Sequence, residues 1–232
     1  MSFLLTDDLV QFEQVLRRWC DEHASIEWLR TKVPLPDAAV EPLAVTLSAE
    51  ERTRLWSGLA ELGVFAAGLP ESAGGLELGI AATRLIVEIC AYQLLPLPVF
   101  ETLALGAARI SSLEASARTT ELLEQVGNGT LSLSGALEAN AGRLEVRTTK
   151  KGTTLSGTLE LVPSAREVDA LVVQGSNGVS YLVGRGAFHE QPTSTLDLVR
   201  PFYRVTFDKA VAEPLGAANE GSVSNLSQYL LV

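Results

Sequence analysis

Cysteine and histidine, which often carry catalysis or bind metals, are few in this chain of 232 residues. The two cysteines, Cys20 and Cys90, lie far apart, so they form neither a disulfide framework nor a closely spaced metal-binding pair. The two histidines, His23 and His189, are equally isolated, whereas a zinc site needs several such ligands. The sequence therefore predicts no metal site, and it favours a reducing, cytoplasmic environment.

Two adjacent glycines, Gly74 and Gly75, stand in the segment 69–79, which reads LPESAGGLELG. Glycine adopts backbone conformations that a Cβ atom forbids, so this pair lets the chain turn tightly between two helices. The glycines either bring the backbone close to a ligand or only shape the turn.

The first half of the chain has the hydrophobic spacing of helices. We expect five helices, over about residues 6–23, 48–63, 78–92, 99–110 and 114–126. Thr6 is the expected N-cap of the first helix, and Ser48 with Glu51 forms an expected capping box at the second. A connection that contains several prolines separates these two helices.

The second half alternates in short runs rich in Thr, Val and Ser, a pattern typical of strands. We expect strands over about residues 131–137, 144–149, 153–161, 170–174, 178–183 and 203–210. The sequence thus predicts an α+β fold: an all-α N-terminal helical domain over residues 1–129, then a small antiparallel β-barrel or sandwich over 130–216. Residues 217–232 become helical again, and we expect them to begin a truncated C-terminal helix.

Composition and charge exclude several classes of function. Hydrophobic residues make up 47% and charged residues 20%, which is typical of a globular protein. No apolar run reaches the roughly 18 residues of a membrane span, and the start of the chain lacks a basic signal-peptide region, so we expect a cytoplasmic protein. A formal net charge of −10 disfavours nucleic acid as a partner.

The glycine loop carries a family resemblance. Pro70, Glu71, Gly74, Gly75 and the residues around them resemble the Pro-Glu-x-x-Gly-Gly-x-Gly loop of acyl-CoA dehydrogenases. Later segments are similar to that family in the same order: 155–158, 168–173 and 195–200. The resemblance implies an α-helical N-terminal domain, a β-barrel middle domain and a C-terminal helical bundle that bears the catalytic base. The sequence stops where that bundle is expected to begin.

The resemblance also implies binding residues. It places the acyl-CoA substrate beside Gly74 and Gly75. It places FAD beside five residues: Leu137, Glu138, Ala139, Val162 and Ser164. The Thr and Trp that the family has in these two flavin segments are absent, so Ser164 either replaces a hydroxyl near flavin N5 or only completes a Pro-Ser turn. Glu138 either lies beside the cofactor or is an exposed carboxylate at a strand end, and Arg200 either meets a phosphate or pairs with Asp197 at the surface.

We therefore expect an acyl-CoA dehydrogenase-like flavoprotein piece or subunit, associated with FAD-dependent α,β-dehydrogenation of acyl-CoA thioesters. No catalytic residue is assigned, and we expect the isolated chain to be inactive and to bind FAD weakly or not at all. The alternative is a non-catalytic scaffold subunit of a heteromeric acyl-CoA dehydrogenase that has lost flavin binding. The partners that the resemblance implies are acyl-CoA, a second copy or a heteromeric acyl-CoA dehydrogenase subunit, and electron-transfer flavoprotein.

Overall fold

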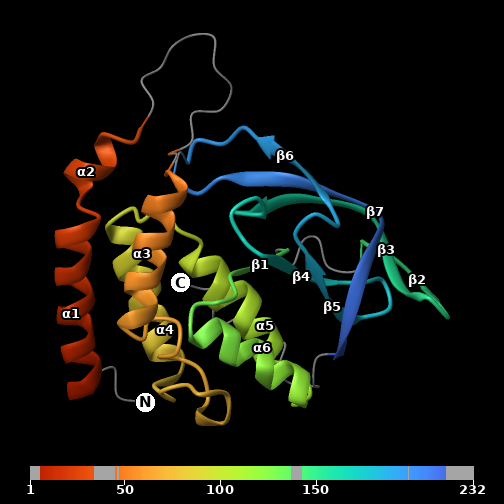
Figure 1. Ribbon diagram of the computed structural model, residues 1–232, viewed down its shortest axis with the longest axis horizontal. Helices are drawn as coiled ribbons and strands as arrows, with labels where there is room; N and C mark the ends of the chain where they lie inside the picture. Colours follow the sequence, from red (N-terminus) through yellow and green to blue (C-terminus); the bar gives the residue numbers. More distant parts are fainter. Residues whose placement is uncertain (1–5, 34–44, 46, 137–142, 198, 218–232) are drawn as a thin grey trace, which may run out of the picture.

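The computed structural model describes residues 6–33, 45, 47–136, 143–197 and 199–217. Helices form the first half and strands the second, as the change in hydrophobic period predicts (Figure 1). The helical elements are α1 (Asp7–His23), α2 (Ile26–Arg30), α3 (Ala49–Glu61), the 3₁₀ turn η1 (Glu71–Ala73), α4 (Gly79–Tyr92), the π-helix η2 (Glu101–Ala107), α5 (Ala108–Ser111) and α6 (Ala117–Gly127). The strands are β1 (Leu133–Gly135), β2 (Glu145–Thr149), β3 (Gly152–Pro163), β4 (Ala170–Gln174), β5 (Val179–Gly184), β6 (His189–Thr193) and β7 (Phe202–Ala217).

Side-chain caps fix where the long helices begin. The hydroxyl of Thr6 accepts the backbone N–H of Leu9 at 3.4 Å, which caps α1 as predicted. Ser48 and Glu51 form the predicted capping box of α3, with reciprocal bonds of 3.1 and 2.9 Å between side chain and backbone. The connection between these helices contains the short helix α2, which the sequence analysis did not predict because its apolar pattern is too brief to show a period.

The helix expected over 99–110 departs from regular α geometry. It is helical from residue 99, as predicted, but Glu101–Ala107 within it form the π-helix η2, every residue of which is buried. Gly106 allows η2 to lie directly against β1, because a Cβ atom there would lie 2.3 Å from the Cβ of Leu133. The hydroxyl of Thr102 accepts the backbone N–H of Leu133 and donates to its carbonyl, at 3.1 Å each. The helical half is therefore anchored directly to the first strand.

The strands form one mixed sheet in the order β1-β4-β5-β7-β3-β2, with β6 also paired to β7. The prediction of an antiparallel barrel or sandwich is wrong for one pair, because β1 and β4 run parallel. The reason lies just before these strands: the Asp169 carboxylate accepts both the backbone N–H and the hydroxyl of Ser132, at 2.8 and 2.6 Å. These bonds hold the starts of β1 and β4 side by side, so both strands leave in the same direction. The long β7 pairs with β5 through one part and with β3 and β6 through another.

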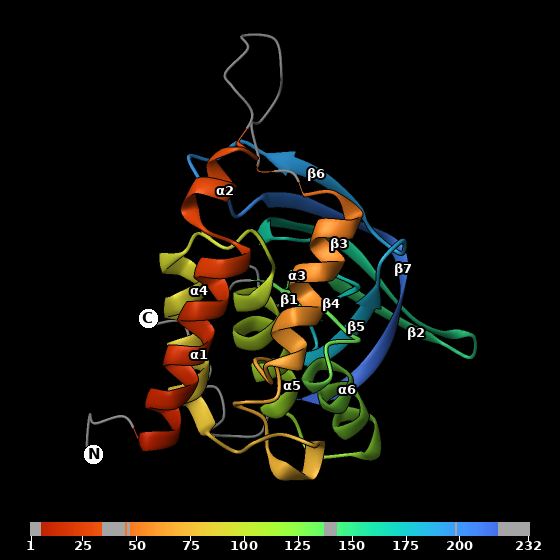
Figure 2. The ribbon, with the colours of Figure 1, turned by 60° about the vertical axis from the view of Figure 1, so that its left-hand side comes forward.

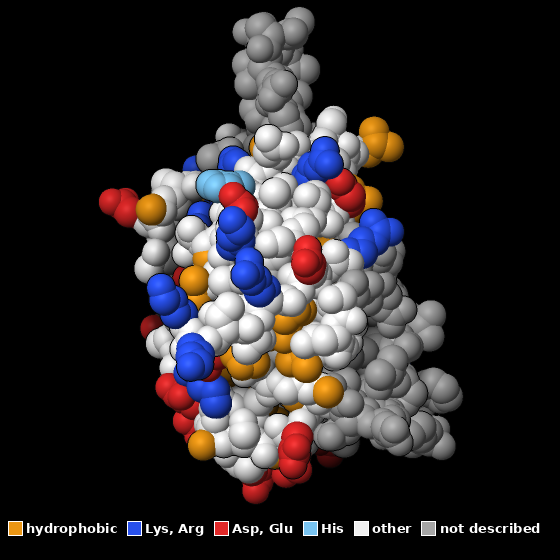
Figure 3. All heavy atoms as spheres, turned by 90° about the vertical axis from the view of Figure 1, so that its right-hand side faces the viewer, with side chains coloured by type: hydrophobic (Ala, Val, Ile, Leu, Met, Phe, Trp, Pro, Cys, Tyr) orange, Lys and Arg blue, Asp and Glu red, His pale blue; other side chains and the backbone are white. Residues whose placement is uncertain are grey.

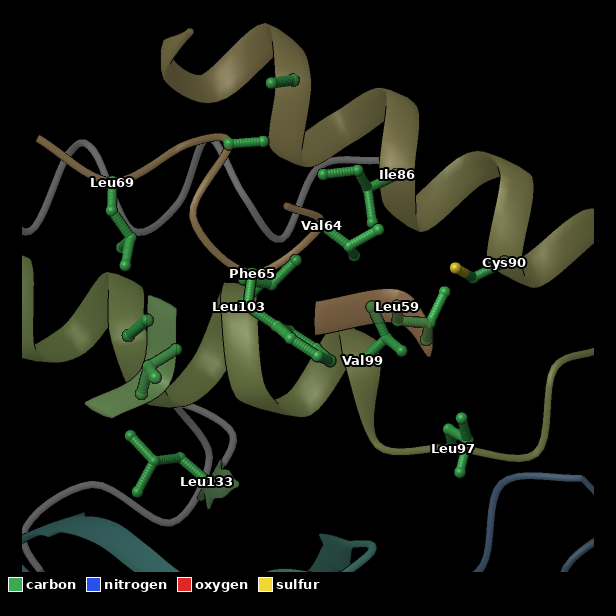
Figure 4. Close-up of a cluster of buried hydrophobic side chains, with 14 of the residues drawn as sticks. Leu59, Val64, Phe65, Leu69, Ile86, Cys90, Leu97, Val99, Leu103 and Leu133 are labelled. Carbon is green, nitrogen blue, oxygen red and sulfur yellow. The ribbon is translucent and has the colours of Figure 1, made fainter. Parts of the chain in front are cut away.

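Strand β4 separates two hydrophobic cores. Its alternate residues Ala170 and Val172 belong to the core on the helical side, while Leu171 and Val173 belong to the core within the sheet. Both views of the ribbon place the helices together on one side of the strands (Figures 1 and 2). Figure 4 shows the core on the helical side, where the side chains of Phe65 and Leu103 lie close together.

The surface carries charges of both signs. On the face seen in Figure 3, Lys and Arg side chains form an interrupted row, with acidic side chains between and below them. Within the described part of the chain, no helix is long and apolar enough to cross a membrane. Apart from Ala217, which ends β7, the helix expected over 217–232 lies outside the described residues.

Candidate functional site

The loop between α3 and α4 forms the tight turn that its two glycines predict. Gly74 ends η1 in the left-handed region, with a φ of 69°, and a Cβ atom there would meet nothing within 4 Å. Gly75 lies against the backbone of Leu69, where a Cβ atom would be 2.1 Å from the carbonyl oxygen. The chain's own backbone therefore accounts for the second glycine, and the proposed substrate contact of both glycines stays a prediction.

The residues expected beside a flavin lie in two segments. Leu137, Glu138 and Ala139 fall outside the described residues. The side chain of Val162 is fully buried in the core of the sheet, so any contact that Val162 made with a cofactor would come from its backbone. Ser164 follows β3 with a φ of 51°, and its backbone N–H donates to the carbonyl of Pro201 at 2.8 Å. The buried hydroxyl of Ser164 hydrogen-bonds to Glu101.

Glu101, the first residue of η2, forms a buried ion pair. It is only 2% exposed, and its Oε1 lies 3.3 Å from Nε of Arg200. The guanidinium of Arg200 also lies over the ring of Phe100, 4.8 Å from its centroid. The expected surface pair between the side chains of Arg200 and Asp197 is wrong. Asp197 instead accepts backbone N–H groups, including that of Arg200 at 3.0 Å. The side chain of Arg200 pairs with Glu101, a buried carboxylate that needs a counter-ion.

The carboxyl groups at this ion pair are incompletely bonded. Burial raises the pKa of Glu101, although Arg200 and Ser164 lower it in part. Oε1 of Glu101 is within ion-pair distance of Arg200, but this buried atom has no hydrogen-bond partner among the described residues. Glu167 accepts a hydrogen bond from the Tyr203 hydroxyl on Oε1 at 2.6 Å, while its buried Oε2 has no hydrogen-bond partner in the part of the chain that the structure describes. Burial and the bond to Glu167 raise the pKa of Tyr203 above its ordinary range.

These groups line a pocket of about 160 Å³ between the helical half and the sheet. Its polar end consists of Glu101, Ser164, Glu167 and Arg200, and its walls include Leu95, Leu97 and Val99. Neither the two loop glycines nor Val162 is among the lining residues. Among the residues that the structure describes, no three His, Cys, Asp or Glu side chains are placed so that they could hold a metal ion.

The sequence analysis identified Ser164 but missed Glu101 and Glu167. A signal for Glu101 was present: it is the lone charged residue in the apolar run from Leu94 to Ala108. A lone carboxylate at a buried position usually has a partner elsewhere in the fold. Nothing in the local pattern of residues around Glu167 distinguishes it from a surface carboxylate.

The comparisons with known proteins agree with the loop motif. Residues 6–113 match the family of acyl-CoA dehydrogenase N-terminal domains. This part of the chain is therefore similar to the N-terminal domain of acyl-CoA dehydrogenases. The match includes the Gly74–Gly75 loop and runs through α5. No curated protein matches the chain in sequence.

Solved acyl-CoA dehydrogenase structures share the fold of the whole chain. The ChsE4-ChsE5 complex from Mycobacterium tuberculosis is 20% identical with a TM-score of 0.77, and the match covers 99% of this chain and 62% of that one. A variant of the Tcur3481-Tcur3483 steroid ACAD is 25% identical with a TM-score of 0.75, and the match covers 96% of this chain and 60% of that one. Butyryl-CoA dehydrogenase from Megasphaera elsdenii is 19% identical with a TM-score of 0.72, covering 96% and 62%. The predicted resemblance and fold class are confirmed, and the chain spans about 60% of the length of these relatives.

Proposed function

We propose that this chain forms the N-terminal and middle part of an acyl-CoA dehydrogenase-type flavoprotein, which takes part in FAD-dependent α,β-dehydrogenation of acyl-CoA thioesters. The match of residues 6–113 to the N-terminal domain of these enzymes carries the proposal. The shared fold of the rest of the chain supports it. In this proposal residues 1–129 are the helical domain and residues 130–216 the barrel domain.

The described residues provide only part of a binding site for FAD. The side chain of Val162 is buried, and the hydroxyl of Ser164 is already bonded to Glu101. The pocket beside Ser164 holds about 160 Å³, below the roughly 300 Å³ at which typical small-molecule sites begin, so a dinucleotide does not fit there. These observations support weak or no FAD binding by the chain alone. FAD, when bound, would supply the acceptor for the substrate hydride.

We further propose that the remaining flavin-binding surface comes from a second chain of acyl-CoA dehydrogenase type or from a second copy of this one. Support comes from a neighbour whose structure is a complex of two different proteins, ChsE4 and ChsE5. The acyl thioester would lie against the Gly74–Gly75 loop of this chain. Leu137, Glu138 and Ala139 would face the flavin, together with the backbone of Val162 and Ser164.

A comparison of two preparations tests this function: the purified chain alone, and a tagged chain isolated with its partners from its own host. Each is passed through gel filtration and scanned for the flavin absorption band. Each is then assayed for reduction of an artificial electron acceptor by acyl-CoAs of several chain lengths, with FAD supplied. We expect the chain alone to be colourless and inactive. We expect the native assembly to carry flavin and to turn over faster than a heat-treated control.

Two results would contradict the proposal at different points. A native assembly with neither flavin nor thioester-dependent reduction would remove the dehydrogenase function. A stoichiometric flavin band that stays with the isolated chain through gel filtration would instead overturn only the need for a partner.

A further inference from the structure

The pocket at Glu101 contains two hydrogen-bond acceptors without donors. Oε1 of Glu101 and Oε2 of Glu167 are both buried without a hydrogen-bond donor among the described residues, although Oε1 of Glu101 lies within ion-pair distance of Arg200. Both residues line the same cavity. Buried polar atoms in native proteins almost always have a partner, and an unpaired one is destabilising. Two such atoms on one cavity therefore call for a donor that enters the cavity.

Two residues with a strained backbone also line this pocket. Of the non-glycine residues with positive φ in the described chain, Leu94 at 52° and Ser164 at 51° both line this pocket. Strained conformations persist only where the surrounding structure holds them, and they cluster at ligand sites. Leu94 is also 47% exposed, and the side chain of Arg200 is 37% exposed, so the lining of the pocket reaches the protein surface at both residues.

The size and lining of the pocket restrict the ligand. A volume of about 160 Å³ is close to that of the roughly 150 Å³ engineered cavity that binds benzene. The walls at Leu95, Leu97 and Val99 are apolar, so they suit a hydrocarbon body of that size. Water alone would donate hydrogen bonds to the carboxyl oxygens at the polar end, but it would leave the apolar walls in contact with water.

The charges decide what the polar end of the ligand must be. Three carboxyl groups, those of Glu101, Glu167 and Asp197, line the pocket beside the single guanidinium of Arg200. That guanidinium already faces Glu101 and Phe100. An anionic ligand would therefore meet like charges, whereas a hydroxyl or ammonium group would meet acceptors.

We propose that this pocket binds a compact hydrocarbon group of about six heavy atoms that carries a hydroxyl or ammonium donor, bonded to the free carboxyl oxygens of Glu101 and Glu167. The site goes beyond the dehydrogenase function proposed above, since it needs neither flavin nor a second chain. The donor group belongs either to a free small molecule or to the far end of an acyl thioester.

Titration of the whole chain with ring-sized probes tests the site. The probes are cyclohexanol and cyclohexylamine as donors and cyclohexanecarboxylate as the anion of similar shape. Binding is followed by NMR shifts of the backbone amides of residues 94–101 and 164–167. We expect saturable shifts with both donor probes, and binding of the carboxylate weaker by about tenfold or more.

Variants at Glu101 separate the role of the acceptor from that of the charge. Glu101→Leu removes the acceptor and should weaken both donor probes about tenfold or more. Glu101→Gln keeps an acceptor, so it should weaken cyclohexylamine and leave cyclohexanol nearly unchanged. Glu88→Gln, at an exposed position of α4, should change neither. If Glu101→Leu does not fold, Glu167→Gln tests the same charge and should weaken cyclohexylamine.

A CoA thioester of 4-hydroxycyclohexanecarboxylic acid distinguishes the two sources of the donor. Tighter binding than that of cyclohexanol, with shifts at the same amides, identifies the thioester; weaker binding identifies a free small molecule. The thioester result also rests on the proposed dehydrogenase function, while the small probes do not. Absence of shifts with both donor probes in the folded chain, or equal binding of the carboxylate, would overturn the site.

Discussion

The hydroxyl of Thr102 joins the helical half to β1, so Thr102→Val should destabilise the whole fold. Thr102 is completely buried, and its Oγ1 bonds both the N–H and the carbonyl of Leu133 at 3.1 Å. Valine keeps the shape of the side chain but leaves both backbone groups buried without partners. Each unpaired group costs about 1–3 kcal/mol, so we expect the free energy of unfolding to fall by about 2–6 kcal/mol.

Urea unfolding followed by far-UV circular dichroism measures this change, and the midpoint should fall at an unchanged slope. Thr158→Val is the matched control. Its hydroxyl is exposed on β3 and lies 3.5 Å from that of Thr206, so its loss should change the free energy of unfolding by less than about 0.5 kcal/mol. If Thr102→Val were as mild as this control, η2 would not be anchored to β1 through that hydroxyl.

Three further predictions concern single groups. Because burial raises the pKa of Glu101, the folded chain binds the proton of this carboxyl group more tightly than the unfolded chain does. The free energy of unfolding should therefore fall as the pH rises from 4.5 through the raised pKa. Urea titrations at several pH values measure this fall, and Glu101→Gln should make it smaller. Gly75→Ala should lower the thermal midpoint more than Gly74→Ala, because only at Gly75 would the new Cβ meet backbone, at 2.1 Å. Trp56→Phe removes the 2.8 Å bond to the carbonyl of Gly129 and should cost about 1 kcal/mol in urea unfolding, and no change would refute that bond.

Much of the fold could be predicted because local signals specify it. The caps at Thr6 and Ser48 act within three residues of themselves, so the sequence displays them directly. The change of hydrophobic period near Gly127 likewise marks where helices give way to strands. These features need no knowledge of what packs against them.

The errors arise where distant segments decide the outcome. The parallel pairing of β1 and β4 depends on the bonds between Ser132 and Asp169, which are 37 residues apart. The π-helix η2 packs closely against Leu133 at Gly106, a contact between segments distant in sequence. Strand β6 was missed because it contains Pro192 and mostly polar side chains, and it forms only by pairing with β7.

The site shows why a motif and a pocket need not coincide. The family resemblance directs attention to the glycine loop and to the flavin segments, whose residues are adjacent in sequence. The buried carboxylate of Glu101 instead meets Arg200 and Ser164 only after the helical half folds against the end of β3. Sequence spacing therefore cannot reveal that arrangement. A lone glutamate in an apolar run can still reveal it indirectly, because a buried carboxylate requires partners that the neighbouring residues do not provide.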